Sequence, residues 1–250
     1  MGICGILRGF SEIEMIGSQP MKSIDLGKLP LFSGLSDSEL SKLTARSRTK
    51  SFRPHSYILH EGDDSDSLYI ILSGSVDILV TDSDGRELVI NDQGPGEYFG
   101  ELALFDNDTR SASVVSREET QVLVISKAAV HGICDQPEKL LASFLENHPE
   151  ITVRIVKDLM TRVRVLTSKL KSFGLFSVRE RIIELINRVG KPTDQGIALP
   201  KLTHQEIAQR VGASREMVTR IIGQLKQEGV IEVSNHQIIL LKFDLLIEDD

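Results

Sequence analysis

The stretch SLYIILSGSVDILVTD, Ser67 to Asp82, decides the fold of the N-terminal half of the chain. Two short runs of aliphatic and β-branched residues flank the pair Ser73-Gly74, a pattern typical of two strands joined by a tight turn. Similar runs extend on both sides, between turn signals at Glu61-Gly62-Asp63, Asp84-Gly85 and Gly94-Pro95-Gly96. No helix-length segment separates these runs, so a long parallel sheet is not expected. The pattern predicts a jelly-roll-like, all-β domain.

The composition is that of a globular protein. The 250 residues are 40% hydrophobic and 26% charged, which suits one large domain or two ordinary ones. Two cysteines can build neither a disulfide framework nor a cysteine-rich metal site. No apolar run approaches the length of a bilayer span. We therefore expect a soluble cytoplasmic protein with no membrane partner, in which residues 1–24 are an N-terminal extension.

The formal net charge of -7 argues against non-specific coating of nucleic acid. It does not exclude a local recognition site. From Ser177 onward, basic residues outnumber acidic ones once the last three residues, Glu248, Asp249 and Asp250, are set aside.

A long amphipathic helix is predicted to follow a β domain that spans residues 25–148. Its apolar residues alternate at spacings of three and four, and we call this line the apolar seam: Val156, Leu159, Val163, Leu166, Leu170 and Phe173. An amphipathic helix usually packs against its own domain, but strict alternation favours a partner helix. The sequence therefore predicts a homodimer. This helix and a hinge are assigned to residues 149–174, with the break at Gly174.

Residues 175–250 have the pattern of a winged helix-turn-helix domain. Ser177 and Thr203 begin helices with capping boxes, because each is followed three residues later by glutamate. Two further helices flank Gly212, with Ala208 and Val218 where they must cross. A hairpin after the second helix supplies the wing.

The second of these helices presents suitable groups for reading DNA. Ser214 is its expected N-cap, and arginine, carboxylate and hydroxyl groups near its start can hydrogen bond base edges and phosphates. The candidate DNA contacts are Thr203, Gln205, Ser214, Arg215, Glu216, Thr219 and Arg220. Such units sometimes bind only proteins, and exposed arginines are ordinary surface residues. A dimer seam upstream favours DNA, since two-fold symmetry matches palindromic half-sites.

The segment GPGEYFGELALFDNDTRSAS, residues 94–113, carries a lone arginine ten residues after a Gly-Glu pair. Arg110 follows Asp106 and Asp108, so it is no basic patch. Taken singly, Arg110 reads as a surface ion pair, Glu101 as a solvated charge and Gly100 as a turn residue. A half-buried cation beside backbone amides would instead suggest a single small anion.

Both motifs together resemble the CRP/FNR family of bacterial transcription regulators, over roughly Leu29 to Leu240. FGELALFDNDTRSAS is similar to the phosphate-binding cassette of that family, and ASREMVTR is similar to its recognition helix. The resemblance implies that Arg110, Ser111 and backbone N–H groups after Gly100 bind a cyclic phosphate, and that Glu101 accepts from the ribose 2′-hydroxyl. The backbone groups include those of Leu102 and Ala103.

The base contact has two readings. When the chain is aligned with the family from its N-terminal side, Thr167-Ser168 on the long helix falls at the position that holds the base. When it is aligned from the C-terminal side without a gap, Leu166-Thr167 falls there instead. The resemblance implies cAMP as effector, ahead of cGMP.

The expected protein is a homodimeric, DNA-binding transcription regulator under allosteric control by a cyclic nucleotide. Its expected partners are a palindromic operator, a second copy of itself and RNA polymerase. Alternatives are the same architecture with another effector or none, and a cyclic-nucleotide-binding regulator of a partner protein. No enzyme is expected, because the sequence offers no nucleophile–base pair, metal spacing or paired carboxylates.

Overall fold

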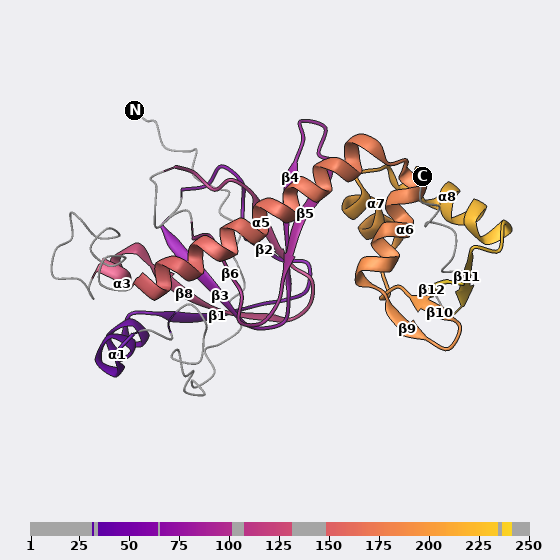
Figure 1. Cartoon of the computed structure of the whole chain (residues 1–250). Coiled ribbons are helices and arrows are strands. Elements are labelled where there is room, and N and C mark those ends of the chain that lie inside the picture. Colours follow the sequence, from indigo (N-terminus) through magenta and orange to yellow (C-terminus); the bar gives the residue numbers. More distant parts are fainter. Residues whose placement is uncertain are drawn as a thin grey trace, which may run out of the picture.

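The computed structural model of the chain describes residues 32, 35–64, 66–101, 108–131, 149–234 and 237–241. Along the chain they form a β domain, a long helix and a C-terminal domain (Figure 1), which confirms the α+β class. The helices are α1 (Asp37–Ala45), α3 (Lys127–His131), α5 (Pro149–Leu175), α6 (Val178–Val189), α7 (His204–Val211) and α8 (Arg215–Gln227). The N-terminal extension, residues 1–24, lies outside the described residues.

The β domain consists of two four-stranded antiparallel sheets, with strand orders β1-β8-β3-β6 and β2-β7-β4-β5. The strands are β1 (Arg48–Phe52), β2 (Tyr57–Leu59), β3 (Ser67–Ser73), β4 (Val76–Thr81), β5 (Glu87–Gln93), β6 (Tyr98–Phe99), β7 (Ser113–Ser116) and β8 (Thr120–Ser126). The chain passes repeatedly between the two sheets, as it does in a jelly roll. The predicted jelly-roll-like domain is confirmed.

Strand β3 is apolar on both faces because both faces are covered. Tyr69 and Ile71 belong to the cluster between the two sheets. Leu68 and Ile70 point the other way, into a second cluster that includes Leu43 of α1. This explains why the quoted stretch shows a nearly continuous apolar run rather than strict alternation.

Helix α5 runs from the β domain to the C-terminal domain (Figure 1). Near its start, Ile155 packs against the cluster that covers β3. Near its end, the Arg181 guanidinium of α6 lies 5.3 Å from the centre of the Phe173 ring. Phe173 is therefore half-buried within its own chain and does not extend the exposed part of the apolar seam.

The helix break expected at Gly174 is wrong. Helix α5 continues through Gly174 to Leu175, and α6 begins after the N-cap Ser177. A glycine inside a helix costs only about 1 kcal/mol relative to alanine, so the turns before it can carry the helix past this residue. The capping box of Ser177, whose side chain accepts from the Glu180 N–H at 3.3 Å, sets the boundary instead.

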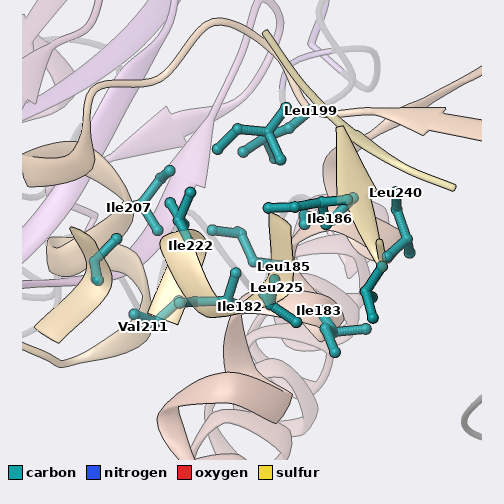
Figure 2. Packing of buried hydrophobic residues seen from close by; sticks show 14 of the residues in the cluster. Ile182, Ile183, Leu185, Ile186, Leu199, Ile207, Val211, Ile222, Leu225 and Leu240 are labelled. Carbon is teal, nitrogen blue, oxygen red and sulfur yellow. The ribbon is translucent and has the colours of Figure 1, made fainter. Parts of the chain in front are cut away.

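The C-terminal domain packs its three helices on a four-stranded sheet of order β11-β12-β10-β9. Its strands are β9 (Lys191–Thr193), β10 (Gly196–Ala198), β11 (Ile231–Ser234) and β12 (Gln237–Leu240). Figure 2 shows the core between helices and sheet, where Ile186, Ile207 and Leu225 are fully buried. The β11–β12 pair is the predicted wing, although its turn at Asn235 lies outside the described residues.

Candidate ligand pocket and nucleic-acid interface

A cavity of about 260 Å³ lies between the second sheet of the β domain and α5. Most of its wall is apolar, and several polar groups also line it. The apolar wall comprises Leu59, Ile78, Ile90, Phe99, Val114, Leu159, Val163, Val165 and Leu166. The polar groups are those of Asn91, Glu101, Thr109, Arg110, Ser111 and Arg162, beside Gly100 and Ala112. The cavity can therefore take a ligand that has both a charged group and an apolar part.

Arg110 is a buried cation on the cavity wall, only 6% exposed. Its guanidinium donates to two carbonyl oxygens, from Nη1 to Gly100 at 3.1 Å and from Nη2 to Ser67 at 2.9 Å. Its Nε atom is buried and has no hydrogen-bond partner among the described residues. Burial lowers the pKa of Arg110, partly offset by nearby Tyr69. The surroundings thus disfavour the isolated charge, and an anion in the cavity would relieve that cost.

Gly100 is required for this arrangement. Its φ of +75° is in the left-handed region, and a Cβ there would lie 2.6 Å from Nη1 of Arg110. Only glycine combines that backbone conformation with such a close approach. Ser111 also lines the cavity. Leu102 and Ala103 lie outside the described residues.

Glu101 connects the cavity to α5. Its carboxylate, 6% exposed as a residue, accepts through Oε1 from Nη1 of Arg162 at 2.5 Å. Nη2 of Arg162 donates to the Tyr98 carbonyl oxygen at 2.8 Å. The Tyr98 hydroxyl in turn donates to Asp158 at 2.9 Å, and burial together with this bond raises the pKa of Tyr98. A continuous polar chain therefore joins the ligand cavity to the long helix.

Sequence reasoning missed Arg162, to which it gave no role in the site. Two signals were present. Arg162 lies one turn from the seam residues Leu159 and Leu166, and Asp158 stands four residues before it on the same face.

The residues of the two readings of the base contact lie differently on α5. Leu166 lines the cavity of its own chain, whereas Thr167 and Ser168 do not. Both of these residues are exposed on α5, and the Thr167 hydroxyl donates to the Val163 carbonyl oxygen at 2.9 Å.

The helix-turn-helix has the geometry expected from the sequence. Thr203 caps α7 in a capping box with Glu206, and Ser214 caps α8 by accepting from the Met217 N–H at 3.2 Å. Gly212 adopts the left-handed conformation between the helices, with φ of +59°. Val218 is fully buried against the domain core.

The candidate DNA contacts share one property, which is exposure. The exposed residues are Thr203, Gln205, Ser214, Arg215, Glu216, Thr219 and Arg220. Hydrogen bonds of its own backbone N–H and of the Ser214 side chain hold the pKa of Glu216 below its usual value, so this carboxylate is ionised. The Thr219 hydroxyl meets Nδ1 of His204 at 2.8 Å, a partner that sequence reasoning missed.

The two domains touch through α7 and the β4–β5 hairpin. Nη2 of Arg210 donates to both carboxylate oxygens of Asp77, at 2.9 and 2.6 Å. Beside this pair, the Gln209 amide donates to Glu87 at 2.5 Å. The first helix of the helix-turn-helix is thus docked on the ligand-binding domain. Nothing in the sequence pattern indicated these long-range pairs.

Within the described ranges, no helix is long and apolar enough to cross a membrane. No group of three or more histidine, cysteine, aspartate or glutamate side chains is placed to hold a metal ion in that same part of the chain.

Comparison with known proteins matches both domains. Residues 49–137 match the family model of the cyclic nucleotide-binding domain, and residues 178–248 match that of the Crp-like helix-turn-helix domain. The chain is 30% identical over 209 residues to the cAMP-activated global transcriptional regulator Vfr of Pseudomonas aeruginosa, covering 80% of this chain and 92% of that one. It is 30% identical over 222 residues to the CRP-like cAMP-activated global transcriptional regulator of Mycobacterium tuberculosis, covering 86% and 93%.

A solved structure agrees with this assignment. The c-di-GMP-responsive global regulator CLP of Xanthomonas campestris is similar with a TM-score of 0.71 and 27% identity, over 83% of this chain and 100% of that one. These relatives are regulators, not enzymes, which confirms the expectation that this protein is no enzyme. Because both domain models match in order and the relatives align over most of their length, the chain belongs to the CRP/FNR family of transcription regulators.

Proposed function

We propose that this family member is a homodimeric, sequence-specific DNA-binding regulator whose operator affinity is controlled by a cyclic nucleotide, with cAMP as the first candidate. One observation gives the main support to the proposal that a cyclic nucleotide is the effector. Arg110 is a buried cation on the wall of the cavity, and its Nε has no partner among the described residues. A single phosphodiester would complete this site.

The rest of the cavity suits the other parts of a cyclic nucleotide. The phosphate lies at Arg110 and Ser111, with N–H groups of the segment after Gly100, including Leu102 and Ala103, as further donors. Oε2 of Glu101 accepts from the ribose 2′-hydroxyl, because Arg162 engages Oε1. The base lies against the apolar wall. We rank cAMP ahead of cGMP because the two 30% identical relatives are named as cAMP-activated.

A second effector candidate is c-di-GMP, since the similar regulator CLP is described as responsive to it. That ligand carries two phosphates. Arg110 is the one arginine or lysine on the described cavity wall that is fully buried, while Arg162 is already paired with Glu101. This charge distribution favours a ligand with one phosphate.

The apolar seam supports the dimer. From Val156 to Leu170 its side chains are 36 to 73% exposed in the single chain. A line of exposed apolar residues along one helix face is stabilised by a matching helix. We propose that α5 pairs with α5 of a second copy. Leu166 then meets the base in its own chain, and Thr167 and Ser168, on the exposed face, reach the nucleotide of the other copy.

The α8 helices of such a dimer would enter successive major grooves of a palindromic operator, with half-sites about one helical turn apart. Exposed Arg215 and Arg220 favour DNA over a protein partner as the target of this domain. Bound at a promoter, the dimer would have RNA polymerase as a further partner.

The mechanism we propose is a population shift between domain arrangements. Nucleotide bound at Arg110 and Glu101 would reposition Arg162, and with it α5. The same helix reaches the docked helix-turn-helix through Phe173. The Phe173 ring lies against Gly212, so close that a Cβ added to this glycine would be 3.1 Å from it. Nucleotide changes DNA affinity only if it binds the two arrangements with different affinity.

Isothermal titration calorimetry of the full chain with cAMP, cGMP and c-di-GMP tests the effector. We expect saturable binding, tightest for cAMP, that is lost in Ser111→Ala combined with Arg110→Lys. Arg164→Gln is the control, since Arg164 is exposed on α5 and away from the cavity wall. If none of the three nucleotides gives a heat of binding, the effector proposal is wrong, whereas the DNA-binding proposal is unaffected.

A further inference from the structure

A second cavity, of about 170 Å³, lies at the junction of the two domains and shares no lining residue with the ligand pocket. Four cationic side chains line it, each from a different part of the fold. They are Arg117 from the loop after β7, Lys169 of α5, Arg188 of α6 and Arg210 of α7. The one carboxylate on the wall is that of Asp92.

The acidic residues nearby do not neutralise these cations. Asp77 is occupied by the bidentate bond from Arg210 and also lies 3.8 Å from Arg117. Asp92 lies 3.9 Å from Arg117. Two carboxylates therefore face four cations.

Lys169 and Arg188 are the cations left over. Among the described residues neither forms an ion pair with a carboxylate. Nζ of Lys169 donates to the carbonyl oxygens of Val89 and Ile90, at 3.2 and 2.8 Å. An ammonium group has three donors, so one remains for a ligand.

The pKa of Lys169 agrees with this excess of cations over carboxylates. Burial and, second to it, the neighbouring Arg188 lower the pKa of Lys169 to about 8. The positive charge is thus unfavourable where it stands, and a bound anion would relieve both costs.

We propose that this junction cavity binds a small, multiply charged oxyanion of the phosphate class, held by Lys169, Arg188 and Arg117. The volume admits such an ion and is smaller than that of the ligand pocket, which is about 260 Å³. Because its walls belong to both domains, the anion would bind only when the helix-turn-helix is docked. It would therefore stabilise the docked arrangement.

The test uses the full chain and inorganic phosphate or pyrophosphate as the probe. Thermal unfolding is followed across an anion titration, against sodium chloride at matched ionic strength. We expect a saturable rise in Tm for the wild type. Arg188→Gln, at an exposed position, should weaken apparent binding by about tenfold or more, as expected for the loss of a charge-assisted hydrogen bond. Lys169→Met should behave alike.

Arg179→Gln is the matched control, since Arg179 is also on α6 but pairs with Glu228 away from the cavity. A Tm response that does not saturate, or that is equal in Arg179→Gln and Arg188→Gln, would overturn the proposal. DNA phosphate is the other source of this chemistry. If Arg188→Gln instead weakens operator binding without added phosphate and flattens its salt dependence, the cations serve the DNA backbone and the small-anion site is wrong. Nucleotide binding in the ligand pocket is measured separately and should not change in these variants.

Discussion

Arg162 of α5 and Glu101 of the β domain, 61 residues apart, are joined by a hydrogen-bonded ion pair of 2.5 Å. The pair is largely buried, with side-chain exposures of 24 and 9%. Both residues line the ligand pocket, and Arg162 lies at the middle of the long helix. A ligand that binds Glu101 would therefore act on α5 directly through Arg162.

Arg162→Gln should uncouple the two domains. The variant keeps the aliphatic stem and a polar amide but loses the positive charge and with it the charge-assisted bond to Glu101. We expect nucleotide binding to be retained, weakened by about tenfold or more, while the effect of nucleotide on operator affinity is lost. Calorimetry and DNA binding measured on the same sample separate the two effects. Wild-type coupling in this variant would show that the pair is structural only.

Gly100→Ala should be more damaging than the same substitution at another glycine with a left-handed backbone conformation. Its Cβ would lie 2.6 Å from Nη1 of Arg110, so the guanidinium must move. Gly85→Ala is the control, because Gly85 has φ of +77° and open space around it. We expect each variant to lose about 1–2 kcal/mol of unfolding free energy from backbone strain, with a further loss and weakened nucleotide binding only for Gly100→Ala. Denaturant unfolding and calorimetry measure both.

Asp77→Asn should release the helix-turn-helix from the β4–β5 hairpin. It leaves the Arg210 guanidinium, whose side chain is 8% exposed, without its anionic partner, and such a loss costs roughly 3–5 kcal/mol when the charge stays buried. We expect the domains to separate instead, seen as faster proteolysis between α5 and α6. Asp84→Asn is the control, since the Asp84–Arg86 pair is 66 and 79% exposed and should contribute almost nothing. Equal proteolysis of the two variants would contradict a docking role.

Stability should depend on pH through Lys169. The unfolded chain binds this proton up to about pH 10.5, whereas the folded chain releases it near pH 8. Between these values the unfolded state binds more protons, so unfolding free energy rises with pH. The charged groups that face Lys169 are Arg188, Asp92, Arg210 and Asp77. Denaturation of wild type and Lys169→Met at pH 7.5 and 9.5 should show this rise in the wild type only; parallel pH profiles would exclude it.

Arg215→Ala should cost about 1–3 kcal/mol of discrimination between the preferred operator and single-base variants. Arg215 is exposed at the start of α8, where recognition helices contact base edges. Lys226→Gln, exposed in the last turn of the same helix, is the control. Competition binding against a panel of operators measures the effect. A uniform loss on all sequences would place Arg215 on the phosphate backbone instead.

Local features of the fold could be predicted from the sequence. The capping boxes of Ser177 and Thr203 depend on residues three positions apart, and both form. Strand pairs and the helix-turn-helix glycine follow from equally short patterns. The break at Gly174 was wrong because a glycine weakens a helix only slightly, whereas a cap with Glu180 fixes where the next one begins.

The long-range contacts could not be predicted in this way. Glu101–Arg162 and Asp77–Arg210 join residues 61 and 133 positions apart, and no periodicity links them. Arg110 and Gly100 were found because they lie within one short motif. The close approach of Gly100 and Arg110, and the hydrogen bond from Arg110 to the Ser67 carbonyl oxygen, depend on where the start of β3 lies in the fold.

The central claim is that a cyclic nucleotide controls DNA binding. The most direct test is the fluorescence anisotropy of a labelled palindrome, selected from a random pool by the protein itself, titrated with the full chain at fixed salt. Saturating cAMP should lower the operator Kd by about tenfold or more, a coupling of about 1.4 kcal/mol, and should have no effect in Arg162→Gln. An operator Kd that is identical with and without cAMP, in a protein shown to bind the nucleotide, would contradict the account.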